Sequence, residues 1–232
     1  MNHANSSVIL IIPSASYRTN PFMDAATKLD LKVLVITDKS QVFSEYFPEK
    51  VITINFEQWQ ESIENIRAWS VKFDLKAVIG VDEESIILAA NLSEFLGIKH
   101  NSLESVKLTK DKYLMRKALK DSGLKSPWFK RFSVNETPKD IVTEISFPCV
   151  LKPTFLSASQ GVIRADNVSE FCISFEILSG LLSQEEMKIQ GGDQANWILV
   201  EEYISGKEVS IEGIVNEGKL KELAIFDKPE PL

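Results

Sequence analysis

Residues 147–153 (FPCVLKP) place a lysine at the end of a short apolar run, and its ammonium is the first candidate for chemistry. Burying an ammonium is costly unless an anion neutralises it. Lys152 is therefore a candidate ligand for an anion. The alternative is a lysine on an edge strand with its head group in solvent, and the pattern alone leaves both open.

A second candidate is the small-residue loop at residues 157–162 (SASQGV). In such a loop the backbone N–H groups can converge on an oxygen anion, and the hydroxyls of Ser157 and Ser159 add donors. The loop is suited to covering phosphates, although an ordinary hairpin also carries serine and glycine. The Walker pattern GxxxxGK[S/T] is absent, so this is not a P-loop.

Three acids surround a short linker at residues 199–208 (LVEEYISGKE). Glu201 and Glu202 end one apolar run, and Glu208 precedes the next. Backbone groups of such a linker can pair with the edge of a purine, and a carboxylate can accept hydrogen bonds from ribose hydroxyls. The pattern suits a nucleoside lying across the linker. A solvated strand end is the other interpretation.

These candidates lie in a half of the chain that is mainly antiparallel α+β. A helical pattern at residues 111–122 ends at Gly123, and residues 124–127 mark a boundary. Short strands follow, with turns expected between consecutive strands at residues 205–206 and 216–218, so that the chemistry-bearing residues fall at strand ends or between strands. The expected strands cover residues 128–132, 149–152, 162–165, 197–202, 208–215 and 220–226.

Residues 1–104 instead alternate between β-branched runs and helical patterns, which predicts a doubly wound parallel sheet of Rossmann-like α/β class. Ligands of such sheets bind beyond the carboxyl ends of the strands. The expected strands are residues 8–12, 32–37, 51–54 and 77–81, and the residues that follow strands are 14–16, 38–39 and 82–84. One expected helix has Asn20 as its cap and Pro21 as its first residue, and two more cover residues 57–73 and 83–96.

The first turn of this sheet lacks the GxGxxG fingerprint, so a classical dinucleotide site is not favoured there. The acidic triplet Asp82, Glu83 and Glu84 can bind a substrate amine or a metal. It can equally be an acidic first turn that complements the dipole of the following helix.

Composition is that of an ordinary globular protein: 232 residues, 44% hydrophobic and 25% charged, with a net charge of -7. The negative charge argues against partners such as nucleic acid or an anionic membrane. Cys149 and Cys172 lack metal-ligand spacing and are expected to be reduced core thiols. The apolar run at residues 8–12 is too short for a signal peptide or a span, so the expected location is cytoplasmic.

Four motifs in order resemble the ATP-grasp superfamily, specifically its carboxylate–amine ligase type. They are Asp111 and Lys112 at the head of a helix (residues 109–116, TKDKYLMR), the FPCVLKP strand, the serine-rich loop that ends in QGV, and VEEYISGKE at residues 200–208. Each motif is only moderately specific, but the four in this order, after a doubly wound domain, carry the resemblance over essentially the whole chain.

The resemblance implies roles for individual residues. Lys112 would reach the α-phosphate of ATP and Lys152 the α- and β-phosphates. The loop residues Ser157, Ser159, Gln160, Gly161 and Val162 would cover the β- and γ-phosphates. The linker Glu201, Glu202, Tyr203 and Ile204 would bind adenine, through the Glu202 carbonyl and the Ile204 amide, and Glu208 would hold the ribose.

The resemblance also implies a reaction, in which ATP activates a substrate carboxylate as an acyl phosphate for attack by an amine. The family's magnesium ligands and catalytic arginine lie on later strands, expected beyond Leu232, so Mg²⁺ would have no ligands within this chain. A truncated ligase that is inactive by itself is therefore expected. The implied domains are a pre-ATP-grasp domain at 1–104, a linker helix at 105–126, a first ATP-grasp subdomain at 127–195 and the start of a second at 196–232.

Two other functions stay open: a regulatory nucleotide-binding module that lost its metal site, and a doubly wound binding domain with a β-rich appendage and no nucleotide. For a ligase, family analogy favours amino-acid or dipeptide ligation, ahead of purine-pathway or biotin-carboxylase-like chemistry. Residues 14–18 and 82–85 are the candidate contributors to substrate binding. A homodimer is a further family expectation.

Overall fold

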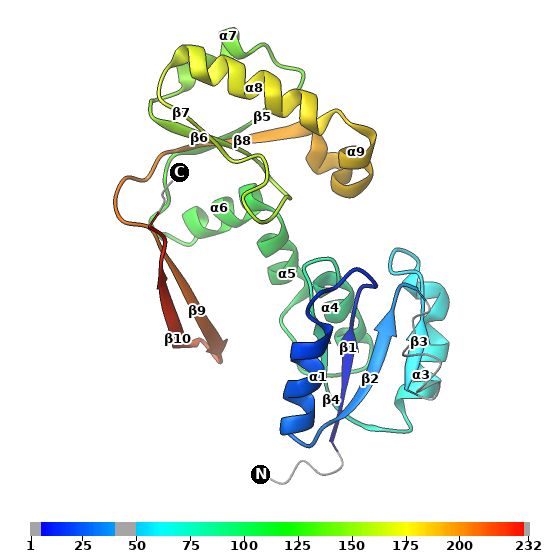
Figure 1. Ribbon diagram of the computed structural model, residues 1–232. Helices are drawn as coiled ribbons and strands as arrows, with labels where there is room; N and C mark the ends of the chain where they lie inside the picture. The colour runs from blue at the N-terminus through cyan, green and yellow to red at the C-terminus, as the bar shows by residue number, and fades with distance from the viewer. Residues whose placement is uncertain (1–5, 40–49, 230–232) are drawn as a thin grey trace. The chain divides into compact units, whose positions relative to one another are not determined.

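The computed structural model describes residues 6–39 and 50–229, and the chain forms two compact units, Met1–Lys110 and Asp111–Leu232 (Figure 1). The two units have different architectures. The first is built on a parallel sheet, and the second on an antiparallel sheet with a separate hairpin. None of the described helices has the length and apolarity needed to cross a bilayer.

The sheet of the first unit contains four parallel strands in the order β3-β2-β1-β4. Because β4 returns to the free edge of β1, the strand order reverses between β1 and β4, which is where open α/β sheets place ligands. The strands are β1 (Ser6–Ile11), β2 (Lys32–Thr37), β3 (Val51–Thr53) and β4 (Asp74–Gly80).

Helices cover both faces of this sheet, as the alternation of side chains along β1 requires. Ile9 and Ile11 pack in one cluster with Leu92, whereas Val8 and Leu10 pack in another cluster on the opposite face. The helices are α1 (Thr19–Lys28), the 3₁₀ turn η1 (Trp59–Ser62), α3 (Ile63–Ser70), α4 (Ile86–Phe95) and α5 (Leu103–Lys110). The expected parallel α/β sheet is therefore present.

Two expected helices are shorter than predicted. The helix expected from residue 83 begins at Ile86, because Asp82 and Ser85 form a turn: the Ser85 hydroxyl donates to the Asp82 carbonyl at 2.8 Å and accepts from the Asp82 amide at 3.2 Å. The pattern at residues 57–73 divides into η1 and α3. Within the range expected as one linker helix, residues 105–126, α5 and the next helix are separate, because Asp111 between them has an extended backbone.

The second unit contains an antiparallel sheet in the order β5-β8-β6-β7. Its core lies between the sheet and α8, where Phe171, Phe175 and Leu178 meet Leu151 and Val200. The elements are α6 (Lys112–Asp121), β5 (Phe129–Ser133), α7 (Pro138–Ile141), η2 (Val142–Glu144), β6 (Cys149–Pro153), β7 (Ile163–Ala165), α8 (Val168–Leu182), α9 (Glu185–Gly191), η3 (Gly192–Asn196) and β8 (Trp197–Glu202).

Two caps explain where helices of this unit begin. Asp111 accepts hydrogen bonds from the amides of Tyr113 and Leu114 at 2.8 and 3.1 Å, which starts α6. Asn167 accepts from the Glu170 amide at 3.1 Å, and Glu170 accepts in return from the Asp166 amide. Cys149 lies in the core, where burial and the nearby Asp166 charge raise the pKa of its thiol to about 11.

The chain ends in a hairpin of β9 (Val209–Asn216) and β10 (Lys219–Asp227). Its turn places Glu217 and Gly218 at φ values of 51° and 76°, the conformation of a two-residue hairpin turn. The paired residues Ile211 with Ile225, and Val215 with Leu220, lie on one face and are exposed. The turn predicted at residues 216–218 is thus present, whereas β8 and β9, on either side of residues 205–206, lie in different sheets.

Candidate functional site

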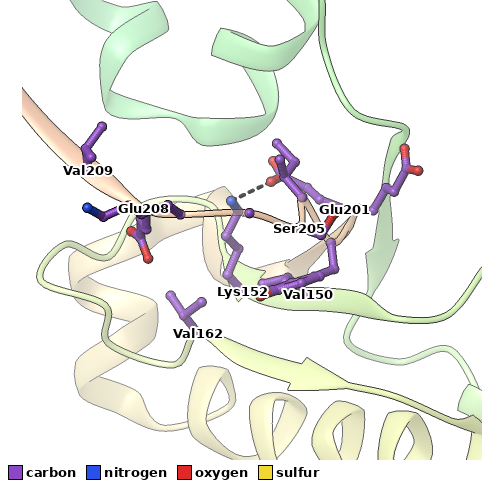
Figure 2. A pocket seen from close by; sticks show the side chains of 12 residues that line it. Val150, Lys152, Val162, Glu201, Ser205, Glu208 and Val209 are labelled. Atoms are coloured by element: carbon purple, nitrogen blue, oxygen red, sulfur yellow. Dashed lines mark hydrogen bonds and ion pairs between the residues drawn. The ribbon is translucent and has the colours of Figure 1, made fainter. Parts of the chain in front are cut away.

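A cavity of about 440 Å³ lies in the second unit, where strand β6 meets the segment that joins β8 to β9 (Figure 2). Its volume is within the usual range for small-molecule sites, roughly 300–1,000 Å³. The lining comes from β6, from the residue that precedes β7 and from the linker: Val150, Lys152, Val162, Glu201, Glu202, Tyr203, Ile204, Ser205, Gly206, Lys207, Glu208 and Val209.

Strand β6 supplies the lysine because side chains alternate along a strand. Cys149, Leu151 and Pro153 are buried, whereas Val150 and Lys152 between them line the cavity. The Lys152 side chain is 16% exposed, and its ammonium lies 2.6 Å from Glu201 Oε2. The interpretation of Lys152 as an edge-strand lysine with a solvated head group is therefore wrong.

Glu201, at the end of β8, is the centre of a three-residue ion cluster. Arg116 of α6 donates to it twice, from Nε to Oε1 at 2.8 Å and from Nη2 to Oε2 at 3.1 Å. The Glu201 side chain is only 5% exposed. Burial by itself raises the pKa of this carboxyl, but the hydrogen bonds from Arg116 and the charge of Lys152 outweigh it, so its pKa lies below the ordinary value.

The cluster predicts a specific acid sensitivity. Because the folded-state pKa of Glu201 is lowered, its stabilisation is present above the ordinary value of 4.5 and fades as the pH falls through that value toward the folded pKa. Urea unfolding of wild type and Glu201→Gln should therefore converge as the pH falls from about 6 to about 3.5. Glu144→Gln, which breaks an exposed ion pair with Lys130, should show no such convergence. Parallel curves for wild type and Glu201→Gln would contradict the lowered pKa.

Two backbone hydrogen bonds hold the start of the linker in place. The Glu202 amide donates to the Trp128 carbonyl at 2.9 Å, and the Tyr203 amide donates to the Pro148 carbonyl at 3.1 Å. The Arg164 guanidinium lies 4.1 Å from the centre of the Tyr203 ring. Ile204 is 66% exposed and lines the cavity, so it offers an apolar surface to a flat ring.

The far end of the linker carries paired charges. Glu208 forms an ion pair with Lys228, and Lys207 lies 3.0 Å from Asp227. Both pairs are largely exposed to solvent. They fix the start of β9 against the end of β10, and they leave the Glu208 carboxylate at the edge of the cavity (Figure 2).

The loop at residues 157–162 turns sharply beside the cavity. The Gln160 amide donates to the Ser157 carbonyl at 3.1 Å, and the Val162 amide donates to the Ser159 carbonyl at 3.2 Å. Ala158, Ser159 and Gly161 all have positive φ values, 51°, 59° and 67°. Three left-handed residues within four positions make this a tightly folded turn of backbone.

The structure brings together only part of the predicted site. Lys152, Val162, Glu201, Glu202, Tyr203, Ile204 and Glu208 line one cavity, whereas Lys112, Ser157, Ser159, Gln160 and Gly161 are not among its lining residues. Lys112 instead contacts the chain that leads into the loop: its amide donates to the Thr154 carbonyl at 2.9 Å, and its ammonium donates to the Leu156 carbonyl.

Arg116 is the functional candidate that sequence reasoning missed. It stands within the TKDKYLMR motif, but its partner Glu201 lies 85 positions later, so no local signal pairs them. Glu201 itself was expected only as part of the adenine-binding linker. In the structure its buried carboxylate is held by two cations, Arg116 and Lys152.

The candidate residues of the first unit also gather at strand ends. Asp38 accepts from the Ser14 amide at 2.6 Å and from the Ser14 hydroxyl at 3.0 Å. Burial raises the pKa of Asp38, but these bonds outweigh it and leave the pKa lowered. Arg18 donates to the Val81 carbonyl at 3.3 Å and lies 3.5 Å from Asp82.

A second cavity, of about 530 Å³, lies beside Asp38 in the first unit. Its other lining residues, which sequence reasoning did not select, are Thr53, Ile54, Asn55, Phe56 and Glu57. Among residues 6–39 and 50–229, no group of three or more His, Cys, Asp or Glu side chains is arranged to hold a metal ion.

A parallel α/β unit, followed by an antiparallel unit with a half-buried lysine in a ligand-sized cavity, defines the class of fold: a two-unit α/β chain with a candidate ligand site in its second unit. The model of the ATP-grasp domain matches residues 145–231, which include all of the residues that line this cavity. The predicted resemblance to the ATP-grasp superfamily, of carboxylate–amine ligase type, is thereby confirmed.

Curated relatives agree with this family. Alanine–anticapsin ligase of Bacillus subtilis (strain 168) is 27% identical over 182 residues, which are 73% of this chain and 38% of that protein. The carbamoyl phosphate synthase large chain of Thermoanaerobacter sp. (strain X514) is 28% identical over 131 residues, 54% of this chain and 11% of that protein. The chain thus spans well under half the length of these relatives.

Solved structures share the fold. An L-amino acid ligase from Bacillus licheniformis superposes with a TM-score of 0.73 at 22% identity and covers 99% of this chain and 55% of its own. An N5-carboxyaminoimidazole ribonucleotide synthetase in complex with ADP superposes with a TM-score of 0.65 at 15% identity, covering 98% and 55%.

Proposed function

We propose that this chain forms the ATP-binding part of an ATP-dependent ligase that joins a carboxylate to an amine. One observation carries the proposal: Lys152 lies in a cavity that also contains the linker, in a cluster with more positive than negative charge. This local excess of positive charge in the cluster favours an anionic group such as the phosphates of ATP. The ligases among the relatives, and the ADP complex among the similar folds, support this choice.

The lining suggests how the nucleotide would lie. The apolar side chains of Val150, Val162 and Ile204 would enclose the adenine ring. The Glu202 carbonyl and the Ile204 amide would pair with its edge, and Tyr203 would hold the linker between them. Glu208, at the edge of the cavity, would accept hydrogen bonds from the ribose hydroxyls.

The phosphates would then extend toward the basic side chains and the loop. Lys152 would contact the α- and β-phosphates, and Lys112 the α-phosphate. The loop residues Ser157, Ser159, Gln160, Gly161 and Val162 would cover the β- and γ-phosphates. Lys112 bonds to the Leu156 carbonyl, immediately before this loop, so phosphate binding at Lys112 and the position of the loop would be linked.

The proposed reaction has two steps. A carboxylate oxygen of the substrate attacks the γ-phosphorus, and the bond from that phosphorus to the β–γ bridging oxygen breaks, which yields an acyl phosphate and ADP. The amine then attacks the acyl carbon, loses a proton, and displaces phosphate. Lys152 would neutralise negative charge that develops on the departing ADP.

Mg²⁺ accompanies ATP in reactions of this kind, where it neutralises phosphate charge. The described residues contain no cluster of acids arranged for it, so no step is assigned to it and no catalytic residue is proposed within this chain.

The first unit would serve as the pre-ATP-grasp domain at 1–104 and would contribute Ser14, Arg18 and Asp82 to substrate binding. An amino acid is the proposed substrate. Several features remain predictions: the linker helix at 105–126, the subdomains at 127–195 and 196–232, a cytoplasmic location and a homodimer.

Calorimetric titration tests the proposal. ATP and ADP are expected to bind saturably with one-to-one stoichiometry, and adenosine more weakly, because the cluster adds its contribution only when phosphates are present. GTP should bind more weakly than ATP, since its purine edge presents the opposite donor and acceptor pattern to the linker. Absence of saturable heat with both ATP and ADP would contradict the proposed function. Amino-acid-dependent release of phosphate from ATP, in the protein that contains these residues, distinguishes a ligase from a binding module.

A further inference from the structure

The ion cluster contains one carboxylate between two cations, and the two cations contact the carboxylate differently. Arg116 spans both oxygens of Glu201 with two hydrogen bonds, whereas Lys152 makes a single contact, to Oε2. A guanidinium has a fixed planar fork that matches a carboxylate, and an ammonium has three donors that can be shared among different acceptors. Arg116 is therefore the principal partner of Glu201.

The three side chains of the ion cluster differ in their position relative to the cavity. Lys152 and Glu201 line the cavity, and Arg116 does not. Arg116 comes from α6 and approaches the carboxylate from outside the lining (Figure 2 shows the contact between Lys152 and Glu201). Without Arg116, the buried carboxylate would have Lys152 as its one remaining partner in the cluster, and this pair would present no net charge to the cavity.

We infer that Arg116 is a positioning residue for phosphate binding, because it neutralises Glu201 and so leaves the positive charge of Lys152 available to an anion. This inference rests on the proposed function and deepens it. The other charged groups that line the cavity do not replace it: Lys207 pairs with Asp227, Glu208 pairs with Lys228, and Glu202 is itself negative. The ligand recognised through this cluster is the diphosphate portion of a nucleotide, and the base and ribose lie on the linker.

A role of Arg116 in phosphate binding differs from a merely structural role because only the first depends on whether the ligand carries phosphates. If Arg116 only stabilised the fold, its loss would weaken the binding of adenosine and ADP by the same factor. If it sets the charge at Lys152, its loss should weaken ADP and leave adenosine unchanged. The ratio of the two dissociation constants is thus the informative quantity, and it is insensitive to the fraction of folded protein.

The experiment measures adenosine and ADP dissociation constants for four proteins by calorimetry: wild type, Arg116→Gln, Glu201→Gln and the double variant. Arg116→Gln should weaken ADP at least about tenfold relative to adenosine. Glu201→Gln removes the negative charge and should bind ADP at least as tightly as wild type. The double variant, in which Lys152 no longer has a carboxylate partner, should recover ADP binding to within about threefold of wild type.

Two controls keep the result interpretable. Arg116→Lys keeps the cation and should retain most of the ADP affinity. Arg131→Gln removes an arginine of the same unit that stacks on Tyr113 and Trp197, away from the cavity lining, and should change neither constant. Circular dichroism and thermal unfolding confirm that each variant folds.

The possible failures are distinguishable. If wild type binds neither ADP nor ATP, the proposed function is contradicted and this inference with it. If wild type binds ADP and Arg116→Gln binds it equally well, or loses adenosine in proportion, only the role of Arg116 is overturned. The same holds if Glu201→Gln fails to restore ADP binding to a folded Arg116→Gln protein.

Discussion

Lys152→Met lowers the affinity for ATP by about a hundredfold, because a charged hydrogen bond to phosphate contributes up to about 3 kcal/mol in a partly buried site and each 1.4 kcal/mol is about a factor of ten. Methionine keeps the length and the apolar stem of the side chain, so the packing beside Val150 changes little. Arg116 still neutralises Glu201 in this variant, and the fold is therefore expected to persist. Calorimetric titration with ATP measures the loss.

A matched substitution controls for the removal of any lysine from this unit. Lys130→Met breaks an exposed ion pair with Glu144, which lies outside the cavity lining, and should leave ATP affinity within about twofold of wild type. Equal ATP affinity of Lys152→Met and wild type would show that the lysine has no part in nucleotide binding. It would also remove the observation on which the proposed function depends.

Gly161→Ala should destabilise the second unit by about 2–5 kcal/mol and weaken binding of ATP more than binding of adenosine. The residue has a φ of +67°, where a Cβ costs about 1–2 kcal/mol. The new methyl group would also lie 3.0 Å from Pro153 Cδ and Cγ and 3.1 Å from Leu178 Cδ2, and such crowding costs about 1–3 kcal/mol. Pro153 follows Lys152, so the strain acts on the strand that carries the lysine.

The same substitution at a glycine with space for a side chain serves as the control for Gly161→Ala. Gly180 is exposed within α8, and a Cβ there would meet no atom within 4 Å. Gly180→Ala should therefore stabilise the unit by about 0.5–1 kcal/mol, through the helix propensity of alanine. Urea unfolding measures both variants. Loss of stability in both, or in neither, would refute the conformational argument at Gly161.

The sequence-based prediction succeeded where local periodicity decides the answer. Continuous β-branched runs such as residues 8–12 identified the parallel sheet, since short runs of this kind are typical of strands buried on both faces. Lys152 was found because a lysine in an apolar run needs an anion, and the structure supplies one in Glu201. The prediction of the hairpin turn at Glu217 and Gly218 likewise depended only on neighbouring residues.

Prediction was limited where distant segments meet. The contact of Arg116 with Glu201 joins α6 to β8, and neither residue carries a sign of the other in its surroundings. Lys112 was expected at a phosphate, and its observed partner is the Leu156 carbonyl, a backbone group that no side-chain pattern reveals. The second cavity, at Asp38, forms from the ends of two strands whose separation depends on packing.

The central claim is that the linker and the loop of the second unit bind one nucleotide, and an amide-resolved NMR titration with ADP tests it most directly. Saturable shifts are expected for the amides of residues 157–162 and 201–208, with a single dissociation constant, while the amides of β1 and β4 in the first unit stay unchanged. Absence of saturable shifts, or shifts confined to the first unit around Asp38 and Asp82, would contradict the account.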